Sequence, residues 1–259
     1  MSDYDRILTG KTALITGGAR RIGRAITLRL AEAGINVVIH YNASAKEAET
    51  VAALAIQQGV KAWTIQADLS VTDEVESIFP RLHGDSGSVD FLINNASVFP
   101  KSHLTELDTG ELFRTLTVNA VAPLILANSF IRQADTGAIV NILDSRILRL
   151  DLDHASYQLS KNMLHTLTGM MAIEYAPRFR VNAVAPGMIL PPVDQDETFL
   201  KKQVAPRFNR GVKVMNRDRL ADVTEAVLFL LSHGFIIGEV IFIDGGQNLK
   251  RFACEKADR

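Results

Sequence analysis

The sequence predicts a single α/β domain: a doubly wound parallel sheet with helices on both faces. First, short β-branched runs alternate with longer helical patterns along the chain. Second, strand runs such as Leu14–Ile15 and Val37–Ile39 are continuously apolar, which is typical of parallel strands buried on both faces. Third, a glycine-rich turn, Gly17-Gly18, separates the first strand from the first helix.

Seven strands are expected where short apolar runs end in polar or turn residues. Their ranges are Thr12–Thr16, Asn36–Ile39, Val60–Gln66, Val89–Asn94, Ala138–Leu143, Arg180–Val184 and Glu239–Ile243. Helices are expected where longer patterns end before glycine or proline or precede the next strand. They cover Arg20–Ala33, Ser44–Gln58, Ala155–Tyr175 and Arg219–Ser232, with further helical stretches between the middle strands. This alternation implies right-handed crossovers between parallel strands.

Length and composition indicate one globular domain over residues 1–259. The chain has 47% hydrophobic and 22% charged residues, which excludes disorder. Its formal net charge of −1 argues against a nucleic-acid or membrane-surface binder, because those need a basic excess. No apolar run approaches the roughly 18 residues of a membrane span, and the polar start Met1–Arg6 is not a signal peptide. We therefore expect a soluble, cytoplasmic protein.

Cysteine and histidine usage argues against structural cross-links. The single cysteine, Cys254, excludes a disulfide framework and a cysteine-based metal site. The six histidines show no paired ligand spacing, so no metal is expected. The long irregular segment Pro186–Gly211 instead predicts a binding loop or lid, a substrate loop at about 187–211, because most connections are much shorter.

The turn Thr16–Gly23 is the first candidate binding element. Glycines between the first strand and helix let the backbone approach a phosphate, which the helix N-terminus stabilises. Gly18 and Gly23 have P-loop spacing, but Arg24 follows where that motif needs lysine, so phosphoryl transfer is poorly supported. The dinucleotide pattern Gly-x-Gly-x-x-Gly is not matched literally, and tight packing alone also produces such turns.

The end of the second strand indicates which dinucleotide would bind. An acidic residue there would bind the adenosine ribose and repel a 2′-phosphate. The chain instead has His40, Tyr41, Asn42 and Ser44 after the strand, with Arg20 and Arg21 in the neighbouring turn. Such groups suit a phosphate, so NADPH is favoured over NADH.

Tyr157 and Lys161 are candidate catalytic residues. Their four-residue spacing places them on one face of the predicted helix. An ammonium beside a phenol lowers the phenol's pKa from about 10 toward the working pH, which makes it a usable proton donor. The pattern is common on surface helices, but its position after the fifth strand strengthens the interpretation.

These motifs resemble the short-chain dehydrogenase/reductase family, a Rossmann-type fold, over nearly the whole chain, and most closely its pteridine reductases. The resemblance implies that the following residues bind the cofactor: Gly17, Arg20, Arg21, Ile22, Gly23, His40, Tyr41, Asn42, Ser44, Asp68, Leu69, Asn95, Ala96, Ser97, Tyr157, Lys161, Pro186 and Gly187. It implies catalytic roles for Asp144, Tyr157, Lys161 and Asn119, with Asn119 holding a water behind Lys161 and Lys161 binding the nicotinamide ribose. It also implies a homotetramer built on the helices that carry Asn119 and Tyr157.

Asp144 bears most directly on the substrate. It lies thirteen residues before Tyr157, where most family members carry serine and pteridine reductases carry aspartate. The resemblance then implies substrate contacts from Arg21, Ser97, Phe99, Asp144 and Tyr157, with Phe99 stacking a flat pterin against the nicotinamide. Two alternatives stay open: Asp144 as a turn cap with Ser145 as the working serine, and Phe99 as a core aromatic.

The expected function is NADPH-dependent reduction of a pterin, such as dihydrobiopterin, dihydromonapterin or dihydrofolate. Hydride transfer would be paired with proton donation from Tyr157. One alternative is a carbonyl reductase of the same family, acting on a 3-oxoacyl or sugar substrate. A second is a non-catalytic NADPH-sensing protein, although such a sensor needs neither Tyr157 nor Lys161.

Overall fold

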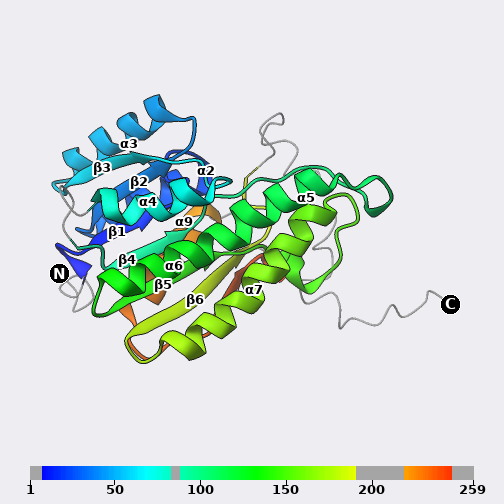
Figure 1. The fold of residues 1–259 in the computed structure, drawn as a ribbon. Coiled ribbons are helices and arrows are strands. Elements are labelled where there is room, and N and C mark those ends of the chain that lie inside the picture. The colour runs from blue at the N-terminus through cyan, green and yellow to red at the C-terminus, as the bar shows by residue number, and fades with distance from the viewer. Residues whose placement is uncertain (1–7, 83–87, 191–218, 247–259) are drawn as a thin grey trace.

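The computed structural model describes residues 8–82, 88–190 and 219–246 (Figure 1). All seven predicted strands are present, and the predicted fold class is confirmed. They are β1 (Thr12–Ile15), β2 (Asn36–Tyr41), β3 (Ala62–Gln66), β4 (Phe91–Asn94), β5 (Gly137–Ile142), β6 (Phe179–Pro186) and β7 (Val240–Ile243). Every neighbouring pair is parallel, in the order β3-β2-β1-β4-β5-β6-β7.

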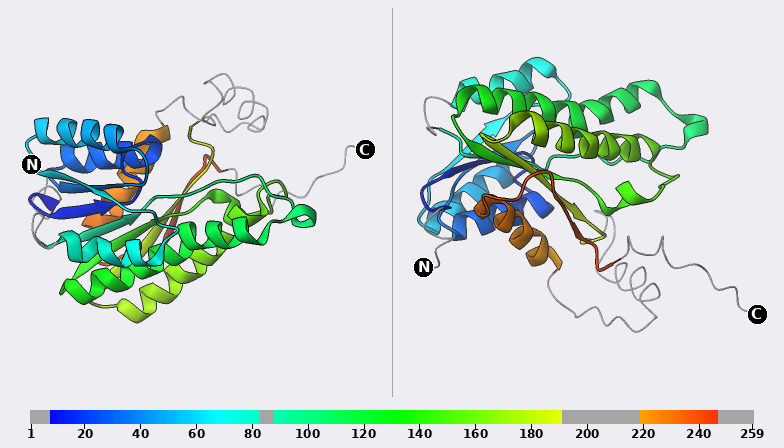
Figure 2. Two further views of the ribbon diagram at one scale, coloured as in Figure 1. Left: turned by 45° about the horizontal axis from the view of Figure 1, so that its top comes forward. Right: turned by 90° about the horizontal axis from the view of Figure 1, so that it is seen from below.

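Helices cover both faces of the sheet (Figure 2). They are α2 (Arg21–Glu32), α3 (Ala45–Gln57), α4 (Thr72–Leu82), α5 (Thr109–Leu116), α6 (Ala122–Gln133), α7 (Ala155–Tyr175) and α9 (Arg219–Ser232). Two short 3-10 helices, η1 (Leu104–Glu106) and η3 (Ser145–Leu148), and a π-helical turn, η2 (Thr117–Val121), join them. Of the predicted substrate loop, only residues 187–190 lie within the described residues.

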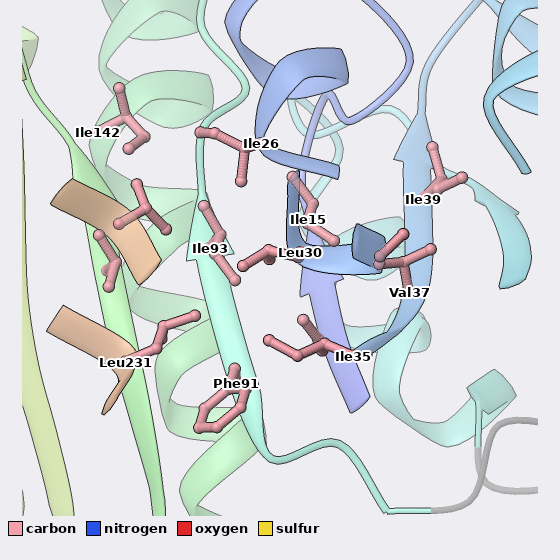
Figure 3. Packing of buried hydrophobic residues seen from close by; sticks show 14 of the residues in the cluster. Ile15, Ile26, Leu30, Ile35, Val37, Ile39, Phe91, Ile93, Ile142 and Leu231 are labelled. Atoms are coloured by element: carbon pink, nitrogen blue, oxygen red, sulfur yellow. The ribbon is translucent and has the colours of Figure 1, made fainter. Parts of the chain in front are cut away.

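Two apolar cores lie on opposite faces of the sheet, because successive strand residues point to opposite sides. Ile15, Ile39 and Ile93 belong to the core that α2 and α9 cover (Figure 3). Leu14 and Leu92 belong to the core that α4 and α6 cover. Burial on both faces is the reason that the central strands are apolar without alternation.

The order of the strands reverses direction at β1. From β1 the chain builds outward through β2 and β3, and then returns to place β4 on the other side of β1. In open α/β sheets, ligands bind at the carboxyl ends of the strands beside such a reversal. The turn Thr16–Gly23 follows β1, and Asn95 and Ala96 follow β4, so predicted cofactor residues lie at this point.

The continuous helical segment Thr109–Gln133, which joins α5, η2 and α6, is unusually apolar. Its most apolar window has a mean hydropathy of 1.2, enough to cross a membrane by length and composition alone, but half of that window is buried inside the fold. Sequence inspection did not predict this segment, because Glu111, Arg114 and Arg132 interrupt it. A single helix of this kind is weak evidence for a membrane span, because core helices of soluble proteins can be equally long and apolar.

Candidate active site

Asp144, Tyr157 and Lys161 meet at the carboxyl end of β5. Asp144 follows β5 and caps η3, while the first turns of α7 carry Tyr157 and Lys161. The Tyr157 hydroxyl donates to Asp144 Oδ2 at 3.0 Å. Lys161 Nζ donates to the main-chain oxygen of Ile142 at 2.8 Å and lies 5.6 Å from the centre of the Tyr157 ring. Three of the four candidate catalytic side chains therefore share one site.

Asp144 both caps a turn and faces the phenol. Its Oδ1 accepts from the main-chain nitrogen of Arg146 at 2.8 Å and from Arg146 Nε at 3.0 Å. Its Oδ2 accepts from Arg146 Nη2 at 2.9 Å as well as from Tyr157. The neighbouring Ser145 is only 3% exposed. Asp144, and not Ser145, is thus the residue that hydrogen-bonds Tyr157.

The pKa of Tyr157 is raised well above its ordinary value of 10.0, by burial first and by the charge of Asp144 second, while Arg146 opposes the rise. The sequence-based expectation of a lowered pKa is wrong for this arrangement, because the phenol is buried and because the Asp144 carboxylate, and not the Lys161 ammonium, hydrogen-bonds it. Burial lowers the pKa of Lys161 to about 8, against the opposing charge of Asp144. In this structure Tyr157 is therefore a protonated hydrogen-bond donor at neutral pH.

Arg146 is a site residue that sequence reasoning missed. Besides its bonds to Asp144, its Nη1 donates to Asp151 Oδ2 at 2.6 Å. Burial lowers the pKa of Arg146, but the hydrogen bonds and charges of Asp144, Tyr157 and Asp151 together outweigh it, and the pKa rises above the ordinary value. The available signal was its position two residues after a candidate catalytic carboxylate, within reach of a bidentate contact.

Phe99 is 48% exposed, which does not fit the alternative of a core aromatic. Its ring stacks on His154 with centres 4.0 Å apart and meets Tyr157 edge-on at 4.5 Å. The Arg146 guanidinium carbon lies 4.7 Å from the centre of the same ring. Side chains of the protein itself, His154, Tyr157 and Arg146, therefore contact the Phe99 ring in this structure. The sequence-based expectation was that a flat substrate stacks on that ring.

Asn119, in η2, is fully buried and ties together the segments around the site. Its Oδ1 accepts from the main-chain nitrogen of Val98 at 2.8 Å. Its Nδ2 donates to the Val98 oxygen and to Ser160 Oγ, each at 2.9 Å. Asn119 thus connects the segment before Phe99 to the helix that carries Tyr157. That it binds a water behind Lys161 stays a prediction.

His40 supports the glycine turn from behind. Its Nδ1 accepts from the main-chain nitrogen of Gly17 at 3.1 Å, and its Nε2 lies 3.0 Å from the main-chain oxygen of Ala67. Burial lowers the pKa of His40 to about 4. Because His40 is 2% exposed and both ring nitrogens are engaged, the prediction that it contacts the 2′-phosphate does not fit the structure.

The glycine turn and the end of β4 hold each other in place. Thr16 Oγ1 accepts from the main-chain nitrogens of Asn95 and Ala96 at 2.9 and 3.0 Å. Asn95 Nδ2 donates to the main-chain oxygens of Thr16 and Gly17 at 2.9 and 3.2 Å. Gly17 has a φ of +62°, and a Cβ on Gly23 would overlap the Gly17 carbonyl. Glycine is therefore required at both positions.

Charged and polar groups lie beside this turn, where a 2′-phosphate was predicted. Arg20 forms an ion pair with Glu47, and both side chains are exposed. Ser44 precedes α3 without capping it through its side chain. Asp68 accepts from Ser70 through nitrogen and hydroxyl at 2.8 and 2.7 Å, and these bonds lower its pKa.

The other predicted site residues differ in exposure. The exposed ones are Arg21, Asn42 and Ser97; the half-buried ones are Ile22, Tyr41 and Gly187; and the buried ones are Leu69 and Pro186. Gly187 donates its main-chain N–H to Ile243 at 2.9 Å, which joins the end of β6 to β7. Leu69 and Pro186 therefore form part of the packing around the site.

A family model described as enoyl-(acyl carrier protein) reductase matches residues 17–248. The chain belongs to the short-chain dehydrogenase/reductase family. That membership makes it an oxidoreductase, in agreement with the Tyr157–Lys161 pair at the carboxyl edge of the sheet.

Several relatives resemble this chain over almost its full length. Pteridine reductase 1 from Leishmania tarentolae is 32% identical over 94% of this chain and 98% of its own. The 3-oxoacyl-[acyl-carrier-protein] reductase FabG of Staphylococcus epidermidis is also 32% identical, over 92% of this chain and 98% of its own. The structure of FolM alternative dihydrofolate reductase 1 from Brucella canis, complexed with NADP, aligns with a TM-score of 0.86 at 35% identity, covering 94% of this chain and 96% of that chain.

The site of this oxidoreductase fits NADP(H), as the NADP-bound neighbour supports. The positive φ of Gly17 and the close packing at Gly23 bring the turn backbone toward the N-terminus of α2, a favourable position for a pyrophosphate. Arg20 supplies an exposed cation beside it, and the end of β2 carries no acid.

Proposed function

We propose that this short-chain reductase uses NADPH to reduce a C=N bond of a pterin or dihydrofolate. The observation that carries the proposal is Asp144, hydrogen-bonded to Tyr157 at 3.0 Å beside the exposed ring of Phe99. A pterin is a flat bicycle edged with donors and acceptors, so it needs an aromatic surface and polar groups at its rim. A simple ketone needs neither.

The segment between β1 and α2, together with Lys161, would hold the cofactor. The turn Gly17–Gly23 and the start of α2 would bind the pyrophosphate, Arg20 the 2′-phosphate, and Lys161 the nicotinamide ribose. When bound, NADPH supplies the hydride. Because Glu47 already pairs with Arg20, a 2′-phosphate would compete with that carboxylate for the guanidinium.

Tyr157 would supply the proton that a substrate nitrogen gains. Its raised pKa keeps the phenol protonated at neutral pH, and its hydroxyl donates to Asp144 before substrate arrives. The proton reaches the nitrogen when the hydroxyl turns from Asp144 toward the ring, or when the carboxylate passes it on. Carbon thus gains hydride and nitrogen gains a proton, which completes the reduction of the double bond.

A carbonyl reductase is the second candidate, favoured by the 3-oxoacyl reductase relative. An unpaired Asp144 would repel the negative charge that develops on a carbonyl oxygen. Arg146 pairs with Asp144 at 2.9 Å, which weakens that argument against ketones. The binding-only alternative is disfavoured, because the contact among Tyr157, Asp144 and their neighbours serves no purpose in cofactor sensing.

The proposed function includes assembly into a homotetramer through α5 and α7. Leu159, Met170 and Ile173 of α7 are exposed, with Ile173 at 83%. Their spacing places all three on one side of the helix, and the exposed Phe113 lies on α5, which packs against α7. A second copy of the chain covering this apolar stripe would remove it from water.

A substrate screen tests the proposed function. NADPH oxidation would be followed with dihydrobiopterin, dihydrofolate, a 3-oxoacyl thioester and a simple ketone, using wild type and Asp144→Ser. We expect wild type to turn over a pterin or folate, and Asp144→Ser to lose that activity while keeping or gaining carbonyl activity. Reduction of carbonyls alone, unchanged in Asp144→Ser, would contradict the proposal.

Phe99→Ala tests the substrate end separately. Lost stacking of about 0.5–1.5 kcal/mol should raise KM for the pterin by roughly 2- to 10-fold and leave KM for NADPH unchanged. Phe235→Ala is the matched control, because that fully exposed ring lies between α9 and β7, at the opposite edge of the sheet. If both variants changed KM for the pterin equally, Phe99 would not be part of the substrate site.

A further inference from the structure

Arg146 provides three of the four hydrogen bonds that the Asp144 carboxylate accepts. Its main-chain nitrogen and Nε bind Oδ1 at 2.8 and 3.0 Å, and its Nη2 binds Oδ2 at 2.9 Å. Nε and Nη2 thus form a bidentate pair of hydrogen bonds with the two carboxylate oxygens, which is the strongest arrangement of an arginine–carboxylate pair. The fourth bond comes from Tyr157, so the orientation of the carboxylate toward the phenol depends on Arg146.

A second carboxylate holds the other end of the guanidinium. Arg146 Nη1 donates to Asp151 Oδ2 at 2.6 Å. Asp151 is itself fixed, because its Oδ1 accepts from the main-chain nitrogen of Asp153 at 3.1 Å and lies 3.1 Å from His154 Nδ1. Arg146, Asp144 and Asp151 are mostly buried, and removing one member of such a set leaves an uncompensated charge.

The guanidinium also contacts the aromatic groups of the site. Its carbon lies 4.7 Å from the centre of the Phe99 ring and 5.4 Å from the centre of the Tyr157 ring. A planar guanidinium combines stacking with a bidentate contact, whereas a lysine ammonium, with its single nitrogen, does not. Arg146 therefore contacts Asp144, Phe99 and Tyr157. In the proposed function, these are the groups that bind the substrate and supply the proton.

We propose that Arg146 is a positioning residue of this active site: it fixes the Asp144 carboxylate against Tyr157, and Asp151 anchors it. Arg146 also offsets part of the Asp144 charge, so the phenol does not work beside a lone anion. This inference deepens the proposed function, but it requires only that the enzyme turn over a substrate, whichever class that proves to be.

A double-mutant cycle tests the proposal with any substrate that the wild type reduces. Arg146→Gln should lower kcat on the order of 10²-fold, the loss expected when a catalytic group shifts by about 1 Å, without changing KM for NADPH. Asp144→Asn should act similarly, and the double variant should be no slower than the slower single variant within about twofold. Arg146→Lys should recover part of the activity.

Arg149→Gln is the matched control. Arg149 ends the same turn, and its side chain makes none of the contacts that Arg146 makes, so its kcat should stay within about twofold of wild type. Losses that multiply to about 10⁴-fold in the double variant would show that Arg146 acts independently of Asp144 and would overturn the proposal. A lowered Tm with unchanged kcat in Arg146→Gln would overturn it too, since it would indicate a structural role.

A readout without substrate separates this inference from the proposed function. The 13C resonance of the Tyr157 Cζ atom reports the hydrogen bonding of its hydroxyl, and Tyr157→Phe assigns it. Arg146→Gln should shift this resonance about as much as Asp144→Asn does, while Arg149→Gln should leave it in place. An unmoved resonance in Arg146→Gln overturns the positioning role, whereas failure to reduce any pterin overturns only the proposed substrate class.

Discussion

Tyr157 stands between a carboxylate that raises its pKa and a guanidinium that lowers it. Burial raises this pKa most, and the charge of Asp144 raises it by more than Arg146 lowers it. Lys161, buried with one main-chain acceptor, has its pKa lowered to about 8. At the residue scale, the Tyr157 phenol is therefore protonated at neutral pH before a ligand binds.

Tyr157→Phe is the first prediction at this scale. The change removes the proton but keeps the ring and its packing, so NADPH binding should persist. General acid catalysis contributes about 10²–10⁴-fold, and kcat should fall within that range. Steady-state kinetics and a fluorescence titration with NADPH measure the two effects; a variant with near-normal kcat would show that another group supplies the proton.

His40 leads to a prediction about stability. The pKa of His40 is about 4 in the folded protein and about 6.5 in the unfolded chain. Between these two pH values, His40 is protonated in the unfolded chain but neutral in the folded protein. Stability is therefore complete above pH 6.5 and decreases as the pH falls toward 4, by about 3 kcal/mol in total.

Thermal unfolding at pH 7.5 and 5.0 measures this effect. His40→Gln should lower Tm at pH 7.5, because the ring's two hydrogen bonds are altered, but should lose less Tm than wild type between the two pH values. His165→Gln, at an exposed position of α7, is the control and should follow wild type. An equal pH-dependent loss in His40→Gln and wild type would contradict the assignment.

At the scale of elements, the β1–α2 turn depends on its neighbours as well as on its own glycines. Thr16 and Asn95 join it to the end of β4, and His40 of β2 supports the nitrogen of Gly17. Three strand ends thus fix one turn before any cofactor arrives. Such preorganisation reduces the entropy that binding must offset.

Cofactor preference is a prediction about this turn and the start of α3. Arg20 should give NADPH at least about a tenfold tighter Kd than NADH, the effect of one charge-assisted hydrogen bond of about 1.5 kcal/mol. Glu47→Gln should release Arg20 and tighten NADPH binding severalfold without changing NADH binding. Fluorescence titrations of both cofactors test this, with Glu49→Gln as control; equal affinities for NADPH and NADH in wild type would rule it out.

At the scale of the whole molecule, one sheet brings the site together. Residues after β1, β4, β5 and β6 converge because parallel strands place their carboxyl ends at one edge. Helix α7 then extends along the outer side of the molecule (Figure 1). Its inner face carries Tyr157 and its outer face carries exposed apolar residues, so the same helix would serve both catalysis and assembly.

Oligomeric state is the prediction at this scale. Wild type should elute as a tetramer in size-exclusion chromatography with light scattering. Ile173→Glu should shift it toward smaller species, because a buried unpaired carboxylate is costly at an apolar interface. Ile56→Glu, an exposed isoleucine on α3, is the control and should remain a tetramer. A monomeric wild type would contradict the proposed assembly.

The sequence by itself determined the fold class, the seven strands and the position of the main motifs. The ends of the predicted strands and named helices lie within two residues of those observed. The reason is physical: strand and helix periodicity, glycine turns and the spacing of Tyr157 and Lys161 are local, and a parallel sheet aligns its strand ends in one way.

Only the tertiary structure decided how the site's side chains contact one another. It buried His40 behind the turn, brought Arg146 between Asp144 and Asp151, and stacked His154 on Phe99. It also reversed the expected direction of the Tyr157 pKa shift. Burial and the contacts between segments that are distant in the sequence, such as His154 on Phe99, depend on how the chain passes in space, and no local pattern of residues encodes them. Arg146 lies close to Asp144 and Asp151 in the sequence, so its contacts are the ones that a local signal could have indicated.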